Sequence, residues 1–203
     1  MITELEKQKY VELWDEPEPT LSMHPQKFAL WLFLVTVVMF FAALTSAYIV
    51  RRVEGRDWLA FELPSMFWIT SVVIILSSIT MHWAYFSAQK DKLVTLKAML
   101  VLTAILGVIF LIGQFYAWIY LVDHKIFFAG KEANPAGSFL YILTGLHGIH
   151  LVSAIVFLLI VLFLSFNYKI HAKSLLTIEM CTTYWHFLGA LWIYLFIFLV
   201  NYH

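Results

Sequence analysis

The sequence predicts an all-α integral membrane bundle of five transmembrane helices, with the N-terminus inside and the C-terminus outside. Two observations carry the fold class: 62% of the 203 residues are hydrophobic and only 13% are charged, whereas soluble domains carry about 25% charged residues. One soluble core of this size could not bury so much apolar surface. The 13 basic residues balance the 13 acidic ones, so no net positive charge supports nucleic-acid binding.

Long stretches without charge place the helices, because roughly 20 apolar residues are needed to cross about 30 Å of hydrocarbon. The first stretch is closed by Arg51 and Arg52, and the last reaches the end of the chain. Helices are favoured over membrane strands because no stretch alternates apolar and polar residues. The five predicted spans are residues 28–50, 63–87, 98–122, 136–167 and 179–201.

Residues 1–27 differ from the rest and are predicted to form a cytoplasmic N-terminal segment, which leaves 28–203 as the five-helix transmembrane domain. Residues 3–14 fit a short surface helix, which Pro17 and Pro19 would end. The mixed charge of the start is not typical of a secretory signal peptide. The first span is therefore predicted to be a permanent helix.

Basic residues orient the bundle, because they concentrate in cytoplasmic loops. The N-terminal side holds Lys7, Lys9, Lys27, Lys90, Lys92, Lys97, Lys169 and Lys173, and the other side holds Arg51, Arg52, Arg56, Lys125 and Lys131. This bias favours an N-terminus inside, which puts His203 outside. The connections are short, so the spans are expected to pack as neighbours in one antiparallel bundle.

Cys181 is the single cysteine. One thiol excludes an intrachain disulfide, a CxxC redox pair and a c-type haem attachment within this chain, as well as a thiolate-bridged copper pair. Cys181 is therefore predicted to be a small buried apolar residue. The sequence contains no glycine-rich phosphate-binding loop and gives no support for a Ser/His/Asp catalytic triad.

Ionisable residues inside a span are functional candidates by default, because they are costly to bury in lipid. The candidates are His82, His147, His150, Glu179 and His186, with Gln114 as the strongest neutral addition. His147 and His150 are three residues apart and share a helix face. Glu179, Thr182, Thr183, His186 and Ala190 form a second polar strip. We expect the histidines to gather in the inner half of the bilayer and to face the bundle rather than lipid.

Three interpretations of this cluster stay open. It can be a packing network of neutral histidines between helices, a bis-histidine haem site, or a polar site for a lipid headgroup or protons. A di-metal carboxylate site needs several buried glutamates and Glu-x-x-His pairs, and Glu179 alone does not supply them. We therefore assign no metal ligands and no catalytic residues.

Two motifs in the fourth and fifth spans carry a resemblance to a known family. Residues 144–151 read TGLHGIHL, and Glu179 is followed by YWHF at 184–187 and LW at 191–192. These resemble the TGxHGxHV and E…WHFxDxxW patterns of subunit III of the haem–copper terminal oxidases, which include cytochrome c oxidase and the quinol oxidases. The resemblance runs from about Trp31 to the C-terminus, and five helices match the short bacterial form.

The resemblance implies a non-catalytic subunit of a proton-pumping complex that reduces O₂ to water in aerobic respiration. It implies that haem and copper lie in partner subunits, that this chain binds neither, and that it holds phospholipid. It also implies direct packing on subunit I, association with subunit II and further respiratory subunits, and a bacterial cytoplasmic (inner) membrane. The residues on family positions, predicted to form a structural polar core near a lipid cleft, are His147, His150, Glu179, Trp185 and His186, with His82 and Gln114 secondary.

The chain departs from the family pattern at three buried carboxylates. Val37, Ala117 and Gly189 stand where relatives often have an acidic residue. Their loss removes costly buried charges and should not harm the scaffold, but it puts local proton supply in doubt. The sequence also leaves open a subunit III-like partner of a nitric oxide reductase and an independent b-type membrane cytochrome, and it does not choose between cytochrome c and quinol as electron donor.

Overall fold

The computed structural model describes residues 24–55, 58, 63–130, 134–167 and 175–202. These residues form five helices, each long and apolar enough to cross a membrane, and no strand occurs among them. The all-α fold class is therefore confirmed. The helices are α2 (Pro25–Val53), α3 (Met66–Gln89), α4 (Leu93–Asp123), α5 (Pro135–Phe166) and α6 (Leu176–Tyr202).

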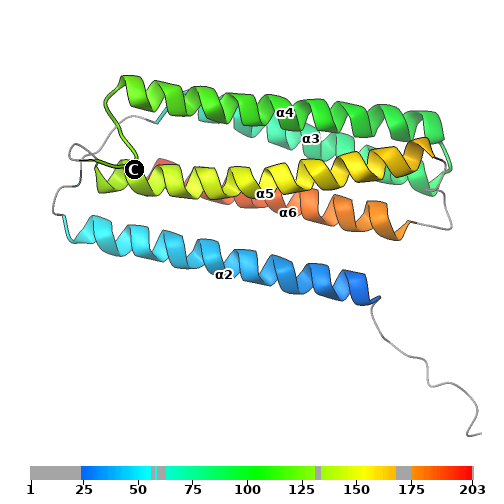
Figure 1. Cartoon of the computed structure of the whole chain (residues 1–203), viewed down its shortest axis with the longest axis horizontal. Helices are drawn as coiled ribbons and strands as arrows, with labels where there is room; N and C mark the ends of the chain where they lie inside the picture. The colour runs from blue at the N-terminus through cyan, green and yellow to red at the C-terminus, as the bar shows by residue number, and fades with distance from the viewer. Residues whose placement is uncertain (1–23, 56–57, 59–62, 131–133, 168–174, 203) are drawn as a thin grey trace, which may run out of the picture.

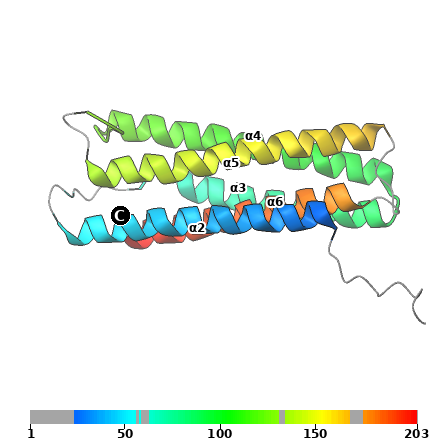
Figure 2. The same ribbon diagram turned by 60° about the horizontal axis from the view of Figure 1, so that its bottom comes forward.

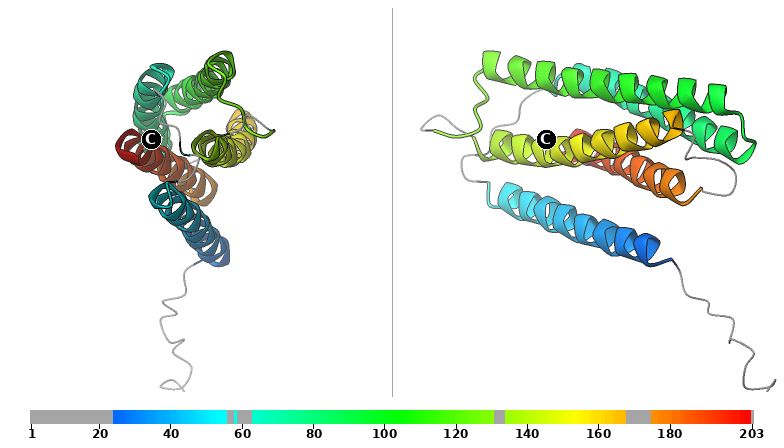
Figure 3. Two further views of the ribbon diagram at one scale, coloured as in Figure 1. Left: turned by 90° about the vertical axis from the view of Figure 1, so that its left-hand side faces the viewer. Right: turned by 45° about the vertical axis from the view of Figure 1, so that its right-hand side comes forward.

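Helices α3, α4, α5 and α6 form a ring in which each helix packs against the next and α6 closes on α3. Helix α2 lies outside this ring and packs against α5 and α6 (Figure 1). Figure 2 shows that consecutive helices run in opposite directions along the long axis of the bundle. The view along the bundle in Figure 3 separates the four-helix ring from α2 most clearly.

Local sequence explains where two of the helices begin. The Asn134 side chain accepts a hydrogen bond from the Ala136 N–H at 3.0 Å, and Pro135 occupies the first turn of α5, a position where proline costs no backbone hydrogen bond. The ring of His24 caps α2 in the same way, through the N–H of Gln26. Polar capping residues therefore set the starts of these two apolar helices.

The helices extend beyond some predicted spans, mainly where charged residues had suggested an end. Helix α2 begins at Pro25 and so includes Lys27, while α4 begins at Leu93 and includes Lys97. Charged side chains at helix ends can reach the membrane surface while the backbone stays helical. The proposed surface helix at 3–14 and His203 lie outside the described residues, and the orientation of the termini stays a prediction.

Tryptophans of α6 fix it to α3. The indole N–H of Trp185 donates to Ser77 Oγ at 3.1 Å, and that of Trp192 donates to Ser71 Oγ at 2.9 Å. Both indoles are buried. A Cβ at Gly107 on α4 would lie 2.7 Å from the Trp185 ring, so only glycine leaves room for this indole at the centre of the ring.

Candidate functional site: polar groups within the bundle

His147 lies at the centre of the ring formed by helices α3, α4, α5 and α6, and none of its surface is exposed. Its ring centroid is 5.3 Å from that of Trp192 and 5.9 Å from that of Phe110. Neither ring nitrogen has a hydrogen-bond partner among the described residues. His147 is therefore an aromatic core residue that a lipid does not reach.

His150, one helical turn further along α5, faces α2 instead. Its ring lies 5.8 Å from Phe41 and 6.3 Å from Phe33, centroid to centroid. Its Nδ1 lies 2.7 Å from the carbonyl oxygen of Leu146. His147 and His150 were predicted to share a helix face, but their side chains have different surroundings. The His147 imidazole lies inside the four-helix ring, and the His150 imidazole lies between α5 and α2.

Glu179 holds the first turn of α6 to the first turn of α2. Its Oε1 accepts a hydrogen bond from Lys27 Nζ at 2.7 Å, and both side chains are about one-third exposed. A partly exposed ion pair at a helix end avoids the cost of an isolated charge in lipid. The carboxylate therefore joins the peripheral helix to the ring and does not reach the histidines.

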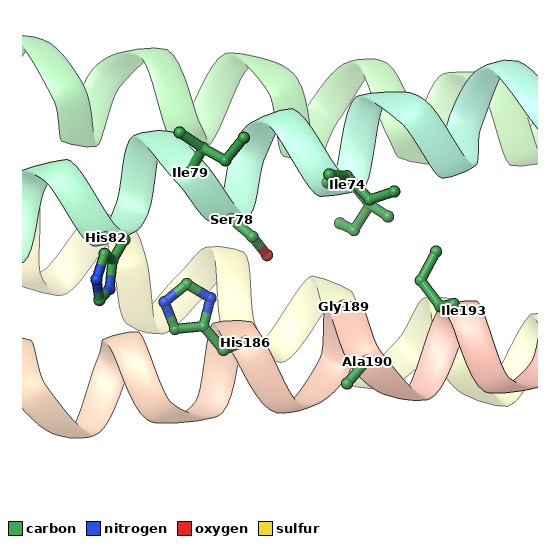
Figure 4. Close-up of a pocket in the computed structure, with 9 residues that line it drawn as sticks. Ile74, Ser78, Ile79, His82, His186, Gly189, Ala190 and Ile193 are labelled. Carbon is green, nitrogen blue, oxygen red and sulfur yellow. The ribbon is translucent and has the colours of Figure 1, made fainter.

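His82 and His186 face each other across α3 and α6, with ring centroids 5.6 Å apart. They line a groove of about 490 Å³, which we call the α3/α6 groove (Figure 4). Its lining is Ile74, Ile75, Ser78, Ile79, His82, His186, Gly189, Ala190 and Ile193. His82 is exposed and His186 is half-buried, so this pair, unlike His147, is open to the surroundings of the bundle.

Gln114 joins α4 to α3 by donating from Nε2 to Thr70 Oγ1 at 3.1 Å, while its Oε1 has no partner among the described residues. It also lines a groove of about 310 Å³ between α4 and α5. There the Trp118 indole N–H donates to Thr144 Oγ1 at 3.0 Å. Gln114 therefore links helices on the side of the ring away from α2.

The three positions that are often acidic in the resembled family are buried here. Val37 is 3% exposed and Ala117 is fully buried. Gly189 lines the α3/α6 groove, where an added Cβ would lie 3.1 Å from Ser78 Oγ. No carboxylate from these positions enters the ring or the groove.

The predicted site residues do not form one cluster. They divide among the ring interior, the α2 side and the α3/α6 groove, so their joint role as a lipid-cleft core stays a prediction. Within the part of the chain that the structure describes, no three His, Cys, Asp or Glu side chains gather as a metal site. The structural role of Trp192 was missed, although its seven-residue spacing from Trp185 and the serines of the second span were available as signals.

Comparison with known proteins decides the family. The sequence profile described as Cytochrome c oxidase subunit III matches residues 20–203. This chain belongs to the cytochrome c oxidase subunit III family. A subunit III is part of a multi-subunit oxidase, so the chain is a multi-pass membrane component of such a complex with a role in the respiratory chain.

Individual relatives agree with this family. The chain is 32% identical over 184 residues to cytochrome c oxidase subunit 3 of Synechocystis sp.. This match covers 86% of this chain and 75% of the relative. It is 32% identical over 174 residues to the subunit 3 of Corynebacterium diphtheriae, with 82% of each chain covered. The subunit 3 of Thermostichus vulcanus is 28% identical over 178 residues. The resemblance predicted from the two helix motifs is confirmed.

Proposed function

We propose that this subunit III packs directly on the haem- and copper-bearing subunit I of a proton-pumping oxidase and adds structural support without chemistry of its own. The observation that carries the proposal is the family match over residues 20–203, which spans all five helices. Subunit II and further respiratory subunits would complete the complex. Bacterial relatives support a cytoplasmic (inner) membrane, with the N-terminus inside as the basic residues indicate.

The large lipid-facing surface of the chain is consistent with such packing. Every described helix exposes several large apolar side chains, among them Met39, Trp68, Phe115, Ile149 and Ile197. In a membrane these side chains contact lipid tails or the apolar faces of partner helices. A bundle of this kind can support a catalytic neighbour through packing alone.

Phospholipid retention forms the second part of the proposal. Between α2 and α5 lies an open hollow of about 600 Å³, whose lining includes Ala43, Ala47, Phe139 and, at the end of α2, Arg51. Small side chains leave room for an acyl chain. The guanidinium of Arg51 pairs with the carboxylate of Glu54, which also lines the hollow, so a phosphate would share or replace that ion pair. His150 of α5 packs on Phe41 of α2, beside the hollow, and we propose that this contact helps to keep the space in shape.

Affinity purification in mild detergent tests the direct partner. The complex should contain subunits I and II by mass spectrometry and should show a haem spectrum that belongs to those subunits. The proposal fails if the chain purifies without any haem–copper subunit. Recovery of a nitric oxide reductase, or a haem band from the chain expressed alone, would support one of the two other functions that the sequence left open.

Lipid analysis of the same complex tests the second part. His150→Leu should reduce bound phospholipid per complex, because it alters the packing of α2 on α5 beside the hollow. His147→Leu is the matched control, since His147 is fully buried within the ring. Equal lipid content in the two variants would refute a role for the α2 side in lipid retention.

A further inference from the structure

The α3/α6 groove contains polar groups that the chain itself does not satisfy. Ser78, His82 and His186 all line it, and none of the three makes a side-chain hydrogen bond to another described residue. Figure 4 shows the two imidazole rings side by side at one end of the groove, with the Ser78 hydroxyl pointing into it. In lipid, polar side chains without partners cost free energy. The groove is therefore suited to an occupant that brings hydrogen-bonding groups.

The polar groups that line the groove indicate an acidic occupant. A second hollow, of about 430 Å³, adjoins the groove by sharing Ile79 and His82, and its lining includes Lys90. The residues lining the two hollows include two histidines and one lysine but neither aspartate nor glutamate. A carboxyl group is the complementary side chain.

Depth separates a protein occupant from a lipid headgroup. His186 is ten residues beyond the start of α6 at Leu176, which places it about 15 Å along the helix axis. Helix α6 has 27 residues, about 40 Å, and so extends about 5 Å past each side of a 30 Å hydrocarbon layer. His186 therefore lies about 10 Å below the membrane surface. A phosphate headgroup stays at that surface, whereas a side chain on a transmembrane helix reaches this depth.

The shape of the groove also suits a helix. Beside the histidines its walls carry Ser78, Gly189 and Ala190, and Ala190 is exposed. Small residues at a helix surface let a second helix come close enough for backbone contact and for interhelical hydrogen bonds. Bulky isoleucines at the far end of the groove, such as Ile193, give the same helix an apolar contact.

We propose that the α3/α6 groove receives a transmembrane helix of a partner subunit, whose Asp or Glu side chain hydrogen bonds His82 and His186. Rings with centroids 5.6 Å apart lie within reach of the two oxygens of one carboxyl group, at hydrogen-bond lengths of about 2.8 Å. The inference rests on the proposed packing against a catalytic subunit and adds which face of the bundle makes the contact and by what chemistry.

Variants of the full chain, expressed with the rest of the complex, test this contact. His82→Phe with His186→Phe keeps the ring volumes but removes the donors, and Ala190→Leu fills the groove. Each should lower the haem recovered per tagged chain by roughly fivefold to tenfold, the size expected from loss of interhelical packing and hydrogen bonds. The matched control is Ala42→Leu, an exposed alanine on α2, which should leave the haem yield unchanged.

A photo-reactive phenylalanine analogue at Ala190 identifies the occupant. The expected cross-link joins a transmembrane segment of an oxidase subunit that contains Asp or Glu, and replacing that residue by Leu should reproduce the loss of haem. Cross-links to lipid alone, or to a segment without an acidic residue, would overturn the inference. Melting temperatures of the isolated variants confirm that each bundle is folded.

Two failures can be told apart. If the wild-type chain purifies without haem-bearing subunits, the proposed function is wrong. If the wild-type chain and all groove variants recover the same haem, the proposed function stands and the contact at His82 and His186 is wrong.

Discussion

Helices α2 and α6 have similar lengths, with 29 and 27 residues, but the chain packs them very differently. In the most apolar part of α6, 56% of the residues are buried, against 22% in α2. The buried residues of α6 lie on most sides of the helix, whereas those of α2 form one narrow stripe of Leu34, Val37, Phe41, Thr45 and Tyr48. Among the five helices α6 is the most buried and α2 the least.

The bonds that hold the two helices differ as well. Helix α6 is joined to α3 by two buried indole-to-serine hydrogen bonds. Helix α2 is held to α6 by the partly exposed Lys27–Glu179 pair and by a hydrogen bond between the hydroxyl groups of Thr45 and Tyr194, with Oγ1 and Oη 3.1 Å apart. The helix whose most apolar part has the higher hydropathy is the less buried one, so hydropathy alone does not predict how a helix packs within the bundle. The part of α2 that the ring leaves uncovered needs lipid or a partner.

The largest effect should follow Trp185→Ala, which removes a buried indole from the centre of the ring and leaves Ser77 without its donor. Loss of a core tryptophan costs about 3–5 kcal/mol. Unfolding of the purified subunit in mixed micelles by a denaturing detergent measures this. Trp83→Ala, at an exposed position of α3, is the control, and equal losses would show that α6 is not the centre of stability.

A smaller loss of stability should follow a substitution at Gly107 but not the same substitution at Gly148. Gly107→Val forces a side chain against the Trp185 ring, because an added Cβ lies 2.7 Å from it, whereas nothing lies within 4 Å of a Cβ at Gly148. Overpacking costs about 1–3 kcal/mol, so Gly107→Val should lower the melting temperature and Gly148→Val should not. Identical melting temperatures would mean that the four-helix ring adjusts freely around the Trp185 indole.

The hydrogen bond between α2 and α6 should contribute less to the free energy of unfolding than the packing around Trp185. A double-mutant cycle of Thr45→Val and Tyr194→Phe removes the hydroxyl pair that joins the two helices. Membrane hydrogen bonds of this kind contribute about 0.6 kcal/mol on average. The coupling free energy from detergent unfolding should be of that order, and a value several times larger would place α2 in the core.

The smallest effect should come from the Lys27–Glu179 pair. Lys27→Ala or Glu179→Gln should cost about 0.5 kcal/mol or less, because the pair is one-third exposed and screened by water and salt. Disulfide trapping between engineered cysteines in the first turns of α2 and α6 reports their separation. Exchanging the charges, Lys27→Glu with Glu179→Lys, should restore the trapping rate if attraction is what holds these ends.

Much of the fold was predictable because lipid imposes strict rules on sequence. All five helices were expected from charge-free stretches, and the burial of Cys181 was expected from its isolation. The membership in subunit III followed from the HGIH and YWHF motifs. Helix ends were less predictable, since charged residues such as Lys97 can stay in a helix and still reach the membrane surface.

The partners of the histidines were not predictable. His147 and His150 share a helix face by spacing, yet one packs on Trp192 and the other on Phe41. Spacing along a helix fixes the direction of a side chain relative to its own axis only. The helix opposite that side chain depends on how the helices pack.

The sequence by itself determined five membrane-crossing helices, a single thiol and the absence of carboxylates at Val37, Ala117 and Gly189, because hydropathy and residue identity are local properties. The tertiary structure decided that α6 is central and α2 peripheral, and that His82 meets His186 across a groove. Helices in lipid have no hydrophobic force to order them, so the fit of residues such as Gly107 against Trp185 determines their arrangement.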